Sequence, residues 1–514
     1  MEFFSLETNL ENDLNNMRKY YESGKTKEAS WRESQLKGLR NFVIENEEKI
    51  LKSLKKDLGK HHVEAFRDEV GILKRSIDLA IKSFRKWMSG KEAKLPQIAL
   101  LSSAEIVAEP LGLVLIISSW NFPFGVSLEP LIGAVAAGNI VVLKPSEMAP
   151  FSSSLLGTVL PNYLDINGIK VIEGGPEVGE QLLHKKWDKI FFTGSARVGR
   201  IVMSAAVEHL TPVTLELGGK CPALLDSLSA SWDREIILFL LNNKMAVKRI
   251  LLAKYGSCAG QACIAIDYVL VEKSFSSTLV QSKNFFSEVE LLKENIQKMF
   301  GDNPKASNTI GRIVNRKHCN RIKSLLNEPK VKESVVFGGS MDEDDLFMEP
   351  TILLDPPLES AIMTEEIFGP LLPIITLEKI EDGIQFINSK GKPLAIYAFT
   401  KNQTLQRRML SETSSGSIVF NDAILQYVAD TLPFGGIGDS GFGKYHGKFS
   451  FDTFSHHKAV ARRSYYTDFW FRFPPWNLNK FQLLEEAYNL NYIGMLLVLL
   501  GLKRSKRSLY MACN

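Results

Sequence analysis

The stretch between residues 112 and 208 alternates short apolar runs with helical segments, and this alternation restricts the fold more strongly than any other feature of the chain. The segments that we interpret as strands lie at 112–118, 140–143, 170–173 and 189–192, of which 112–118 is a continuous apolar run. Segments with helical spacing lie between them at 131–137, 152–160 and 178–183. Continuous apolar runs are typical of parallel strands that are buried on both faces. Strands that alternate with helices therefore predict a doubly wound α/β sheet with right-handed crossovers.

The length and composition fit a globular protein of enzyme size. A chain of 514 residues exceeds the size at which a single core stops growing, so we expect several domains and a cleft between them. With 45% hydrophobic and 23% charged residues, the composition excludes a disordered chain. The net charge of +4 is spread along the sequence, which gives no argument for binding nucleic acid.

The cysteines indicate a reducing compartment. There are five of them, at Cys221, Cys258, Cys263, Cys319 and Cys513. An odd number without zinc-like spacing argues against a disulfide framework and against a structural metal site. The acidic N-terminus lacks an apolar core of the kind found in secretory signals. We therefore expect the protein to face the cytosol.

The first part of the chain predicts long charged helices between Leu10 and Trp87, with apolar residues at helical spacing. We expect these helices to supply packing and no chemistry. The adjacent pair His61 and His62 is not interpreted as a metal site, because neighbouring helical residues point in different directions.

A glycine-broken loop at 256–263 holds the strongest candidate for chemistry. A helical run at 246–255 leads into the loop, and an apolar run at 264–271 that we interpret as a strand leads out of it. Rigid elements on both sides would hold Cys263 in place as a nucleophile. The alternative is that Cys263 is a small buried hydrophobe, which is the usual state of a lone intracellular cysteine.

Further motifs accompany this loop in a fixed order. They are SWNFP at 119–123, VVLKPSE at 141–147, FFTGSARVG at 191–199, ELGGK at 216–220, GQAC at 260–263, EEIFGP at 365–370, LPFGG at 432–436 and FDTFSH at 451–456. Together they resemble the aldehyde dehydrogenase superfamily over roughly residues 10–465. Within the superfamily, the sequence is most similar to the family 3 branch that includes fatty aldehyde dehydrogenase.

The resemblance implies an aldehyde dehydrogenase-like α/β fold and a homodimer. Its parts would be a doubly wound Rossmann-type cofactor domain, an α/β catalytic domain and a bridging β-flap used in oligomerisation. The implied division is 1–93 and 110–217 for the dinucleotide-binding domain, 218–422 for the catalytic domain, 94–109 and 423–466 for the bridging segments, and 467–514 for a C-terminal tail. Short alternating segments at 98–101 and 104–109 suit the hairpin of the flap.

The resemblance also implies oxidation of an aldehyde to a carboxylic acid through a cysteine thiohemiacetal and a thioester. Cys263 would attack the aldehyde, while Asn121 and the Cys263 N–H would hold the oxyanion. Glu216 would activate the water that hydrolyses the thioester. Apolar residues and glycines flank Glu216, so we expect desolvation to raise its pKa toward neutrality. The alternative for Glu216 is a simple strand end.

For the cofactor, the resemblance implies NAD and leaves NADP open. The turn that contains Thr193, Gly194, Ser195 and Gly199 lies between a strand and a helix, where free N–H groups and the helix dipole favour a phosphate. The resemblance would place a dinucleotide pyrophosphate near Ser195. The spacing of the glycines in this turn differs from the G-x-G-x-x-G fingerprint, so an ordinary turn is the alternative.

Four more residues would complete the cofactor site. Lys144 and Glu147 follow a strand, and strand ends carry ligands in open α/β sheets. By similarity they would bind the adenosine ribose, and a salt-bridged loop is the alternative. Glu366 would orient the nicotinamide ribose and Phe368 would pack beside the ring, unless both residues only anchor their loop.

Ten residues at 236–245 depart from the family pattern, because the chain is roughly ten residues longer than expected between Glu216 and Cys263. They begin with six apolar residues, which is unusual for a surface loop, and we interpret them as an accidental insert. As a helix they would add about 15 Å. An NAD-binding, membrane-attached but catalytically impaired homologue is therefore an alternative function. A thiol hydrolase is a third, but no histidine motif accompanies Cys263.

The tail contains an apolar run at 492–502, which is shorter than the roughly 20 residues that span a bilayer. Aromatic residues precede it and basic residues follow it, namely Trp470, Phe471, Phe473, Trp476, Lys503, Arg504, Lys506 and Arg507. This pattern favours an interfacial anchor on a membrane such as the endoplasmic reticulum, with a buried C-terminal helix as the alternative. Chain-length preference does not follow from the tail, but the resemblance to the fatty aldehyde dehydrogenase branch implies medium- or long-chain aliphatic aldehydes as substrates.

Overall fold

The computed structural model describes residues 2–96, 99, 102–226, 234–273, 288–466 and 468–503. Contacts divide the chain into two compact units. The larger unit comprises Met1–Arg85 and Pro110–Ser455, and the smaller unit comprises Lys86–Glu109 and His456–Asn514. Residues 423–455, which we assigned to a bridging segment, therefore fall within the larger unit.

The N-terminal region is helical, as the sequence predicts. Its elements are α1 (Glu2–Glu22), the 3-10 turn η1 (Lys25–Lys27), α2 (Ala29–Glu45), α3 (Glu47–Leu58), α4 (His62–Ala65), the π-helical turn η2 (Phe66–Val70) and α5 (Gly71–Met88). Helix α3 buries Ile50, Leu54 and Leu58 on one side. It ends at Gly59, whose φ of +67° lies in the left-handed region that favours glycine.

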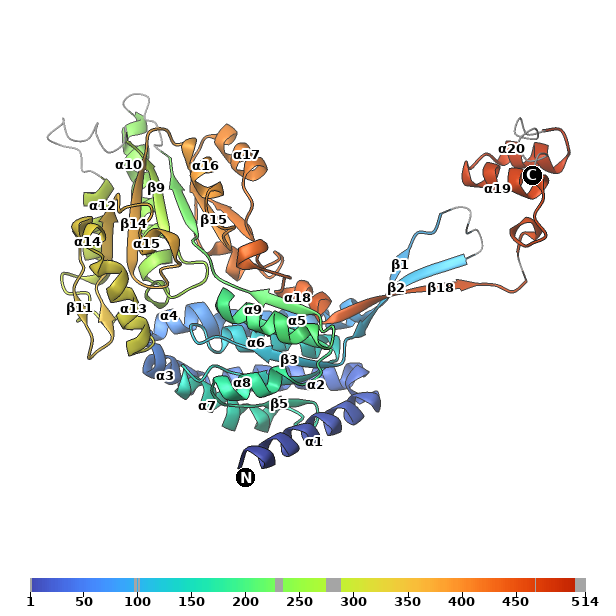
Figure 1. Ribbon diagram of the computed structural model, residues 1–514, viewed down its shortest axis with the longest axis horizontal. Coiled ribbons are helices and arrows are strands. Elements are labelled where there is room, and N and C mark those ends of the chain that lie inside the picture. The colour runs from blue at the N-terminus through green and yellow to red at the C-terminus, as the bar shows by residue number, and fades with distance from the viewer. Residues whose placement is uncertain are drawn as a thin grey trace. The chain divides into compact units, whose positions relative to one another are not determined.

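Within the described residues, six strands form one sheet in the order β17-β7-β6-β3-β4-β5. Figure 1 labels β3 and β5 of this sheet. The strands are β3 (Leu113–Ile117), β4 (Ile140–Lys144), β5 (Ile169–Val171), β6 (Lys189–Thr193), β7 (Val213–Glu216) and β17 (Gly441–Phe442). All neighbours pair in parallel except β17, which runs antiparallel to β7. The doubly wound sheet predicted from the alternating pattern is therefore confirmed.

Helices cover both faces of this sheet, which is why its strands are apolar on both sides. They are α6 (Gly125–Ala137), α7 (Pro150–Thr158) with the 3-10 turn η4 (Leu160–Tyr163), α8 (Pro176–Leu183), α9 (Ala196–Val207) and α18 (Gly447–Thr453). On one face, Leu115 and Phe192 pack in a core with residues of α1, α8 and α9. On the other, α6 contacts β3 and β4, and Phe191 lies 5.7 Å from the ring of Phe454.

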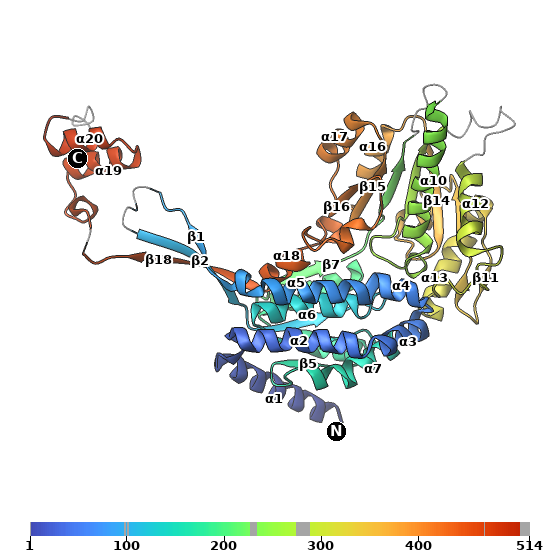
Figure 2. The same cartoon turned by 180° about the vertical axis from the view of Figure 1, so that it is seen from behind.

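A second sheet of the larger unit has the order β10-β13-β14-β9-β8-β15-β16 over the described residues (Figure 2). Its strands are β8 (Pro222–Leu225), β9 (Tyr268–Glu272), β10 (Val335–Phe337), β13 (Thr351–Leu354), β14 (Leu371–Leu377), β15 (Ala395–Phe399) and β16 (Ser417–Phe420). The accompanying elements are α10 (Arg234–Tyr255), η5 (Cys258–Gly260), α12 (Glu288–Phe300), α13 (Arg316–Asn327), α14 (Pro329–Glu333), the pair β11 (Met341–Asp342) and β12 (Phe347–Met348), α15 (Ala361–Thr364), α16 (Asp382–Asn388), α17 (Gln403–Glu412), η6 (Leu425–Val428) and η7 (Gly438–Ser440).

The structure agrees with one expectation around the loop at 256–263 and corrects another. The unusual residues 236–245 are part of α10, so they lengthen the start of that helix. The apolar run at 264–271 is a strand only from Tyr268 onward. The Ala265 N–H donates to the Ala262 carbonyl, so residues 262–265 form a turn although they are apolar.

Over its described residues, the smaller unit contains a three-stranded sheet in the order β1-β2-β18, formed by β1 (Lys91–Ala93), β2 (Ser102–Pro110) and β18 (Ser455–Arg463). The predicted strand at 98–101 falls largely outside the described residues, and the partner of β2 is the earlier segment β1. The unit continues with η8 (Trp470–Arg472), α19 (Leu478–Tyr488) and α20 (Tyr492–Leu499). Among the described residues, no helix is long and apolar enough to cross a membrane.

Candidate active site

Several motif residues meet at one edge of the six-stranded sheet, because parallel strands end at the same edge. Asn121 follows β3, Lys144 ends β4, Thr193 ends β6 and Glu216 ends β7. In open α/β sheets, this carboxyl edge is where ligands bind. The sheet therefore gathers residues that are up to 95 positions apart in the sequence.

The turn between β6 and α9 brings backbone N–H groups to this edge. Ser195 is the N-cap of α9, and its Oγ accepts a hydrogen bond of 3.4 Å from the Val198 N–H. A Cβ at Gly194 would lie 2.5 Å from the Phe192 ring, and one at Gly199 would lie 3.0 Å from Leu217. Both glycines thus allow close packing, and the first turn of α9 starts directly at the sheet.

At the end of β4, Lys144 and Glu147 form an ion pair of 3.0 Å between Nζ and Oε2. The Lys144 side chain is buried, whereas the Glu147 side chain is 40% exposed. The carboxylate therefore remains accessible at the carboxyl edge while the ammonium group holds it.

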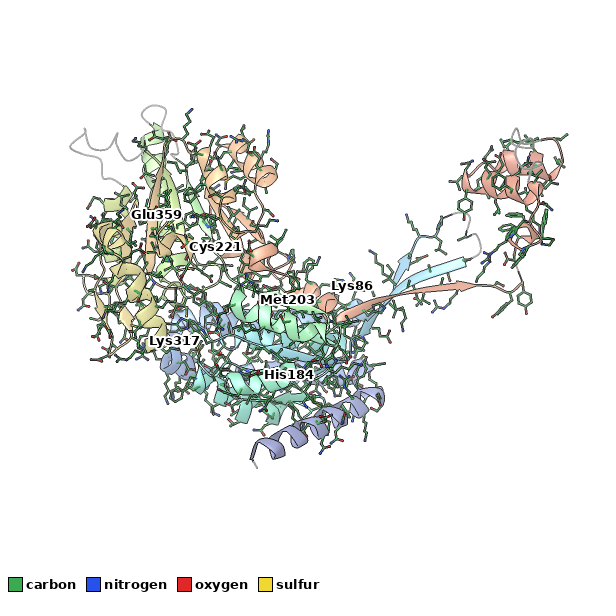
Figure 3. All side chains as sticks on the ribbon, viewed as in Figure 1. Lys86, His184, Met203, Cys221, Lys317 and Glu359 are labelled. Carbon is green, nitrogen blue, oxygen red and sulfur yellow. The ribbon has the colours of Figure 1, made fainter. Side chains whose placement is uncertain are left out.

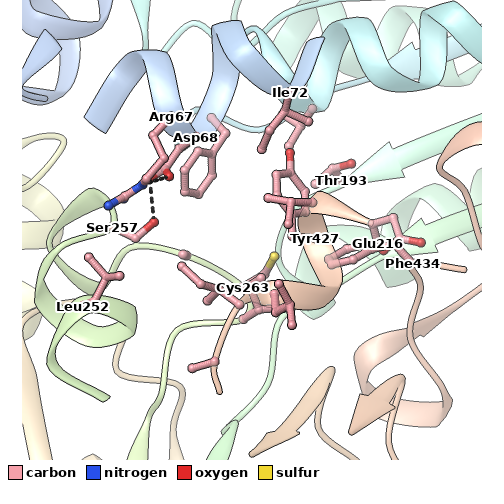
Figure 4. A pocket seen from close by; sticks show the side chains of 18 of the residues that line it. Arg67, Asp68, Ile72, Thr193, Glu216, Leu252, Ser257, Cys263, Tyr427 and Phe434 are labelled. Carbon is pink, nitrogen blue, oxygen red and sulfur yellow. Dashed lines mark hydrogen bonds and ion pairs between the residues drawn. The ribbon is translucent and has the colours of Figure 1, made fainter. Parts of the chain in front are cut away.

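A mostly apolar cavity of about 220 Å³ lies beside this edge (Figure 4). Thr193 and Glu216 line it from the six-stranded sheet, and Cys263 lines it from the loop before β9. Figure 4 shows the Cys263 sulfur directed into the cavity. The apolar and aromatic lining residues are Ile72, Phe122, Val126, Leu252, Ala262, Ile264, Ala423, Ile424, Leu425, Tyr427, Val428, Phe434 and Tyr445.

Cys263 is the accessible thiol among the described cysteines. Its side chain is half-buried, whereas Cys221 (labelled in Figure 3), Cys258 and Cys319 are buried. The Cys221 thiol donates to the Cys263 carbonyl over 3.4 Å, and the Cys258 thiol donates to the Asn121 carbonyl over the same distance. Burial raises the pKa of Cys258 to about 12, so that thiol stays protonated.

The loop that carries Cys263 is held in an unusual backbone conformation. Cys258, Ala259 and Gly260 have φ values of +49°, +51° and +78°. Left-handed residues other than glycine persist only where their surroundings impose them. Here the buried Gln261 side chain does so: its Nε2 donates to the carbonyls of Cys258 and Arg312, each over 2.9 Å, and its Oε1 accepts from the Val314 N–H.

The ionisation of Cys263 and Glu216 is coupled. Both carboxyl oxygens of Glu216 are buried without a hydrogen-bond partner among the described residues, and burial raises the pKa of Glu216 well above its usual value. Burial also raises the pKa of the Cys263 thiol, as do the nearby carboxylates of Glu366 and Glu216. The N–H groups of Cys263 and Ile264 act in the opposite direction. A neutral Glu216 therefore makes the thiolate easier to form.

Glu366 approaches the same edge from the loop between α15 and β14. Its Oε1 accepts the Gly219 N–H over 2.9 Å, and burial, reinforced by the Asp267 carboxylate, raises its pKa to about 7. The Lys220 ammonium pairs with Asp267 and donates to the carbonyls of Ile362 and Glu365. These bonds tie the loop to the segment after β7.

Phe368 stands in the same loop with a φ of +48°. Its ring packs edge-on against Trp120, with 5.5 Å between the ring centroids. The aromatic pair joins the SWNFP segment to the EEIFGP loop.

Comparison with known proteins decides the family. The model of the aldehyde dehydrogenase family matches residues 7–460. The chain belongs to the aldehyde dehydrogenase family. Aldehyde dehydrogenase family 3 member F1 of Arabidopsis thaliana is 51% identical over 500 residues, which cover 97% of this chain and 100% of the relative. Family 3 member B2 of Mus musculus is 43% identical over 88% of this chain and 89% of the relative.

The fold of the enzyme agrees. The structure described as the substrate-bound state of Staphylococcus aureus AldH superposes with a TM-score of 0.86 and 39% identity, covering 93% of this chain and 99% of that one. The resemblance to the family 3 branch is confirmed by the named relatives. These findings do not favour the alternative of an impaired homologue.

The enzyme brings some predicted site residues together and separates others. Thr193, Glu216 and Cys263 line one cavity. Asn121 is buried and is not among the lining residues. Its Nδ2 donates to the Gln261 carbonyl over 3.0 Å and its Oδ1 accepts from Ser119, so one amide N–H remains for another acceptor.

The N-terminal helices contribute residues that sequence reasoning missed, since we expected packing alone from them. Arg67 and Asp68 line the cavity. Arg67 donates to the Gly256 carbonyl over 2.8 Å, and the Ser257 hydroxyl donates to Asp68 over 3.0 Å. The available signal was the acidic pair at 68–69 within an otherwise amphipathic helical pattern. Tyr427 and Tyr445 also line the cavity, and neither residue was given a role from the sequence.

Proposed function

We propose that this enzyme oxidises aliphatic aldehydes to carboxylic acids with NAD, using Cys263 as the nucleophile and Glu216 as the general base. The observation that carries the proposal is the shared cavity. A half-buried thiol and a buried carboxyl that has no hydrogen-bond partner among the described residues face one apolar space. Such a pair supplies covalent attack and proton removal in the same place.

The carboxyl edge of the six-stranded sheet fits a dinucleotide. Thr193 Oγ1 is buried and lacks a hydrogen-bond partner among the described residues, and a Cβ at Gly218 would lie 2.1 Å from the Glu366 carboxylate. The start of α9 suits a phosphate. Solved relatives of the same fold include a betaine aldehyde dehydrogenase of Staphylococcus aureus in complex with NAD+ and a glyceraldehyde-3-phosphate dehydrogenase of Methanocaldococcus jannaschii complexed with NADP.

Each part of the cofactor has candidate residues. Gly194, Ser195 and Gly199 shape the turn for the pyrophosphate, while Lys144 and Glu147 would bind the adenosine ribose. Glu366 would accept hydrogen bonds from the nicotinamide ribose, and Phe368 would support the ring. The accessible Glu147 carboxylate favours ribose hydroxyls over a 2′-phosphate, which supports NAD ahead of NADP. When bound, the nicotinamide accepts the hydride.

The first half of the reaction forms a bond to sulfur. The Cys263 thiolate attacks the aldehyde carbon, and the carbonyl electron pair moves to oxygen. The Cys263 N–H and the uncommitted N–H of Asn121 would stabilise this oxyanion. As the oxyanion collapses, hydride leaves the carbon and a thioester on Cys263 remains.

The second half consumes water. Glu216 removes a proton from water, whose oxygen attacks the thioester carbonyl, and the Cys263 thiolate leaves as the acid forms. Burial raises the pKa of Glu216, which makes its carboxylate a stronger base. The apolar cavity keeps other water away from the thioester.

The lining of the cavity supports an apolar substrate. Phe122, Val126, Ile424 and Leu425 offer contact to an alkyl chain. Arg67 is bonded to Asp68 over 2.5 and 2.7 Å, so this pair adds no net charge. Medium- or long-chain aliphatic aldehydes are therefore the proposed substrate class.

The test follows NADH absorbance at 340 nm with hexanal and NAD. Cys263→Ala is expected to abolish turnover. Glu216→Gln is expected to release about one equivalent of NADH per site and then stall, because the thioester persists. Cys319→Ala, a buried cysteine away from the cavity, is the matched control and should keep the wild-type rate. Turnover of hexanal by Cys263→Ala would contradict the proposal.

A specific observation also favours contact with a lipid surface. The C-terminal elements leave many large apolar side chains 49–74% exposed, namely Trp470, Phe473, Trp476, Tyr488, Leu490, Tyr492, Ile493, Leu496, Leu499, Leu500 and Leu502. Exposed apolar patches of this kind mark interaction sites, and aromatic residues suit the membrane interface. We propose that they bind the cytosolic face of a membrane.

Vesicle flotation tests this second role. The full-length enzyme is expected to float with vesicles of phosphatidylcholine and phosphatidylserine, whereas Ile493→Glu with Leu496→Glu should remain in the bottom fraction. Replacement of the exposed Ile166 by Glu is the matched control. Equal flotation of all three proteins would refute a role for α20.

We also propose a homodimer. Strand β18 lies at an edge of the three-stranded sheet, and an edge strand can pair with another chain. Light scattering on the full-length enzyme is expected to give twice the chain mass, and Val460→Pro in β18 should give a monomer. A monomeric wild type would refute this assembly.

A further inference from the structure

Lys60 is a fully buried cation that no sequence motif singled out. Its Nζ pairs with Glu69 Oε1 over 2.8 Å, and both side chains have zero exposure. The same Nζ donates to the Asn121 carbonyl over 2.8 Å and lies 3.9 Å from the centre of the Phe122 ring. Burial alone would lower the pKa of Lys60, but the adjacent Glu69 carboxylate raises it above its usual value, so Lys60 stays protonated.

Glu69 connects this cation to the start of α6. Its Oε2 accepts the N–H groups of Phe124 and Gly125 over 2.9 and 3.1 Å. Carboxylates are stabilised at helix N-termini by such bonds. The SWNFP segment is thus fixed twice, through the Asn121 carbonyl and through the backbone that follows Pro123.

Asn121 passes this constraint to the loop of the nucleophile. Its side-chain amide donates to the Gln261 carbonyl, and its own carbonyl also accepts the Cys258 thiol. Rotation of the Asn121 peptide would therefore move the amide that faces residue 261, two positions before Cys263. In the proposed mechanism, the second N–H of this amide binds the oxyanion.

The neighbouring residues of the same helical segment bind the loop as well. Glu64 accepts the Cys258 N–H over 2.7 Å, and Asp68 accepts the Ser257 hydroxyl. The π-helical turn η2 contains the consecutive residues Asp68 and Glu69. The Asp68 carboxylate binds the loop, and the Glu69 carboxylate binds Lys60. Such turns are frequent at functional sites.

We propose that Lys60 is a positioning residue for the oxyanion-binding amide of Asn121, and that Glu69 holds Lys60 in place. The inference rests on the proposed function. Stability alone is a weak reason for the pair, because a buried ion pair can often be replaced by apolar residues at little cost. The bond to the Asn121 carbonyl gives the pair a role at the reacting atoms.

The test is a double-mutant cycle on steady-state turnover of hexanal with NAD. Lys60→Met is expected to lower kcat about 10- to 100-fold, since misplacing a catalytic group by about 1 Å costs about that much. The Kd for NAD should change less than about twofold, because Lys60 lies outside the residues proposed for the cofactor. Lys52→Met, which breaks an exposed ion pair on α3, is the matched control and should keep the wild-type kcat.

Epistasis separates positioning from a general effect on the fold. If Lys60 acts through Asn121, the kcat of the double variant Lys60→Met, Asn121→Ala should be less than about threefold below that of Asn121→Ala alone. A multiplicative loss in the double variant, or a wild-type kcat in Lys60→Met, would overturn the proposal. Should Lys60→Met fail to fold, Lys60→Met with Glu69→Gln removes both charges together and enters the same cycle.

Acylation of Cys263 by p-nitrophenyl acetate distinguishes this proposal from the proposed function. That reaction needs no cofactor and also forms an oxyanion. If the wild type does not oxidise aldehydes, the proposed function is wrong. The double-mutant cycle of Lys60→Met and Asn121→Ala can still be measured from the acylation rate. If Lys60→Met slows acylation in the wild-type background but not in the Asn121→Ala background, the positioning role is supported. An equal decrease in both backgrounds refutes it.

Discussion

The pH dependence of cofactor affinity follows from the surroundings of Glu366. Burial, with the Asp267 carboxylate as the next cause, raises the pKa of Glu366 to about 7. Only the ionised carboxylate accepts hydrogen bonds with both oxygens, and Oε1 already accepts the Gly219 N–H. Protonation below pH 7 should therefore weaken the proposed contact with the nicotinamide ribose.

The size of the effect can be worked out from this pKa. With a pKa of about 7, about one-eleventh of Glu366 is ionised at pH 6 and about ten-elevenths at pH 8. If only the ionised form binds well, the Kd for NAD is about tenfold higher at pH 6 than at pH 8. Glu366→Gln should bind NAD with low affinity, and its Kd should vary less than about twofold over the same pH range.

Isothermal titration calorimetry at pH 6, 7 and 8 measures this dependence on wild type and Glu366→Gln. Adenosine is the matched control ligand, because it carries the adenosine ribose, no nicotinamide ribose and no phosphate that titrates in this range, so its Kd should stay constant. A flat Kd for NAD in the wild type would refute the reasoning. So would an equal slope in Glu366→Gln, since another group would then be titrating.

Three further predictions concern other parts of the larger unit. Burial raises the pKa of Glu129 to about 8, so the free energy of unfolding falls by about 4 kcal/mol as the pH rises from 5 to 8. Glu129→Gln should remove this loss. The variant should therefore gain more in melting temperature over wild type at pH 8 than at pH 5. Gly218→Ala should weaken NAD binding at least about tenfold in calorimetry without lowering the melting temperature by more than a few degrees, because its Cβ would lie 2.1 Å from Glu366. Deletion of 236–245 shortens α10 at its start, so kcat for hexanal should stay within about twofold of wild type, and a lost or much higher activity would contradict this.

Local sequence patterns carried much of the fold. The buried strands β3, β4 and β6 appeared as continuous apolar runs, and the turn after Thr193 appeared as glycines between a strand and a helix. The order of strands in the sheet then fixed which residues meet, because every parallel strand ends at the same edge. Glu216 and Thr193 could be grouped in this way from the sequence.

Other parts depend on contacts that a sequence pattern does not contain. The run at 264–271 is apolar throughout, yet its first residues form a buried turn, since apolar composition cannot separate a strand from a packed loop. The roles of Lys60, Asp68 and Glu69 were missed because the residues that these side chains bind, at 121–125 and 256–258, are distant in sequence.

The anchors on the loop after α10 also matter for protein engineering. Arg67 and Asp68 bind Gly256 and Ser257, so the end of α10 next to the nucleophile is the fixed point of that helix. We therefore expect residues added or removed near Arg234 to change where the helix starts and to leave its other end in place. The beginning of α10 is thus the position that we predict to accept an epitope or a fluorescent label while the thiol keeps its place.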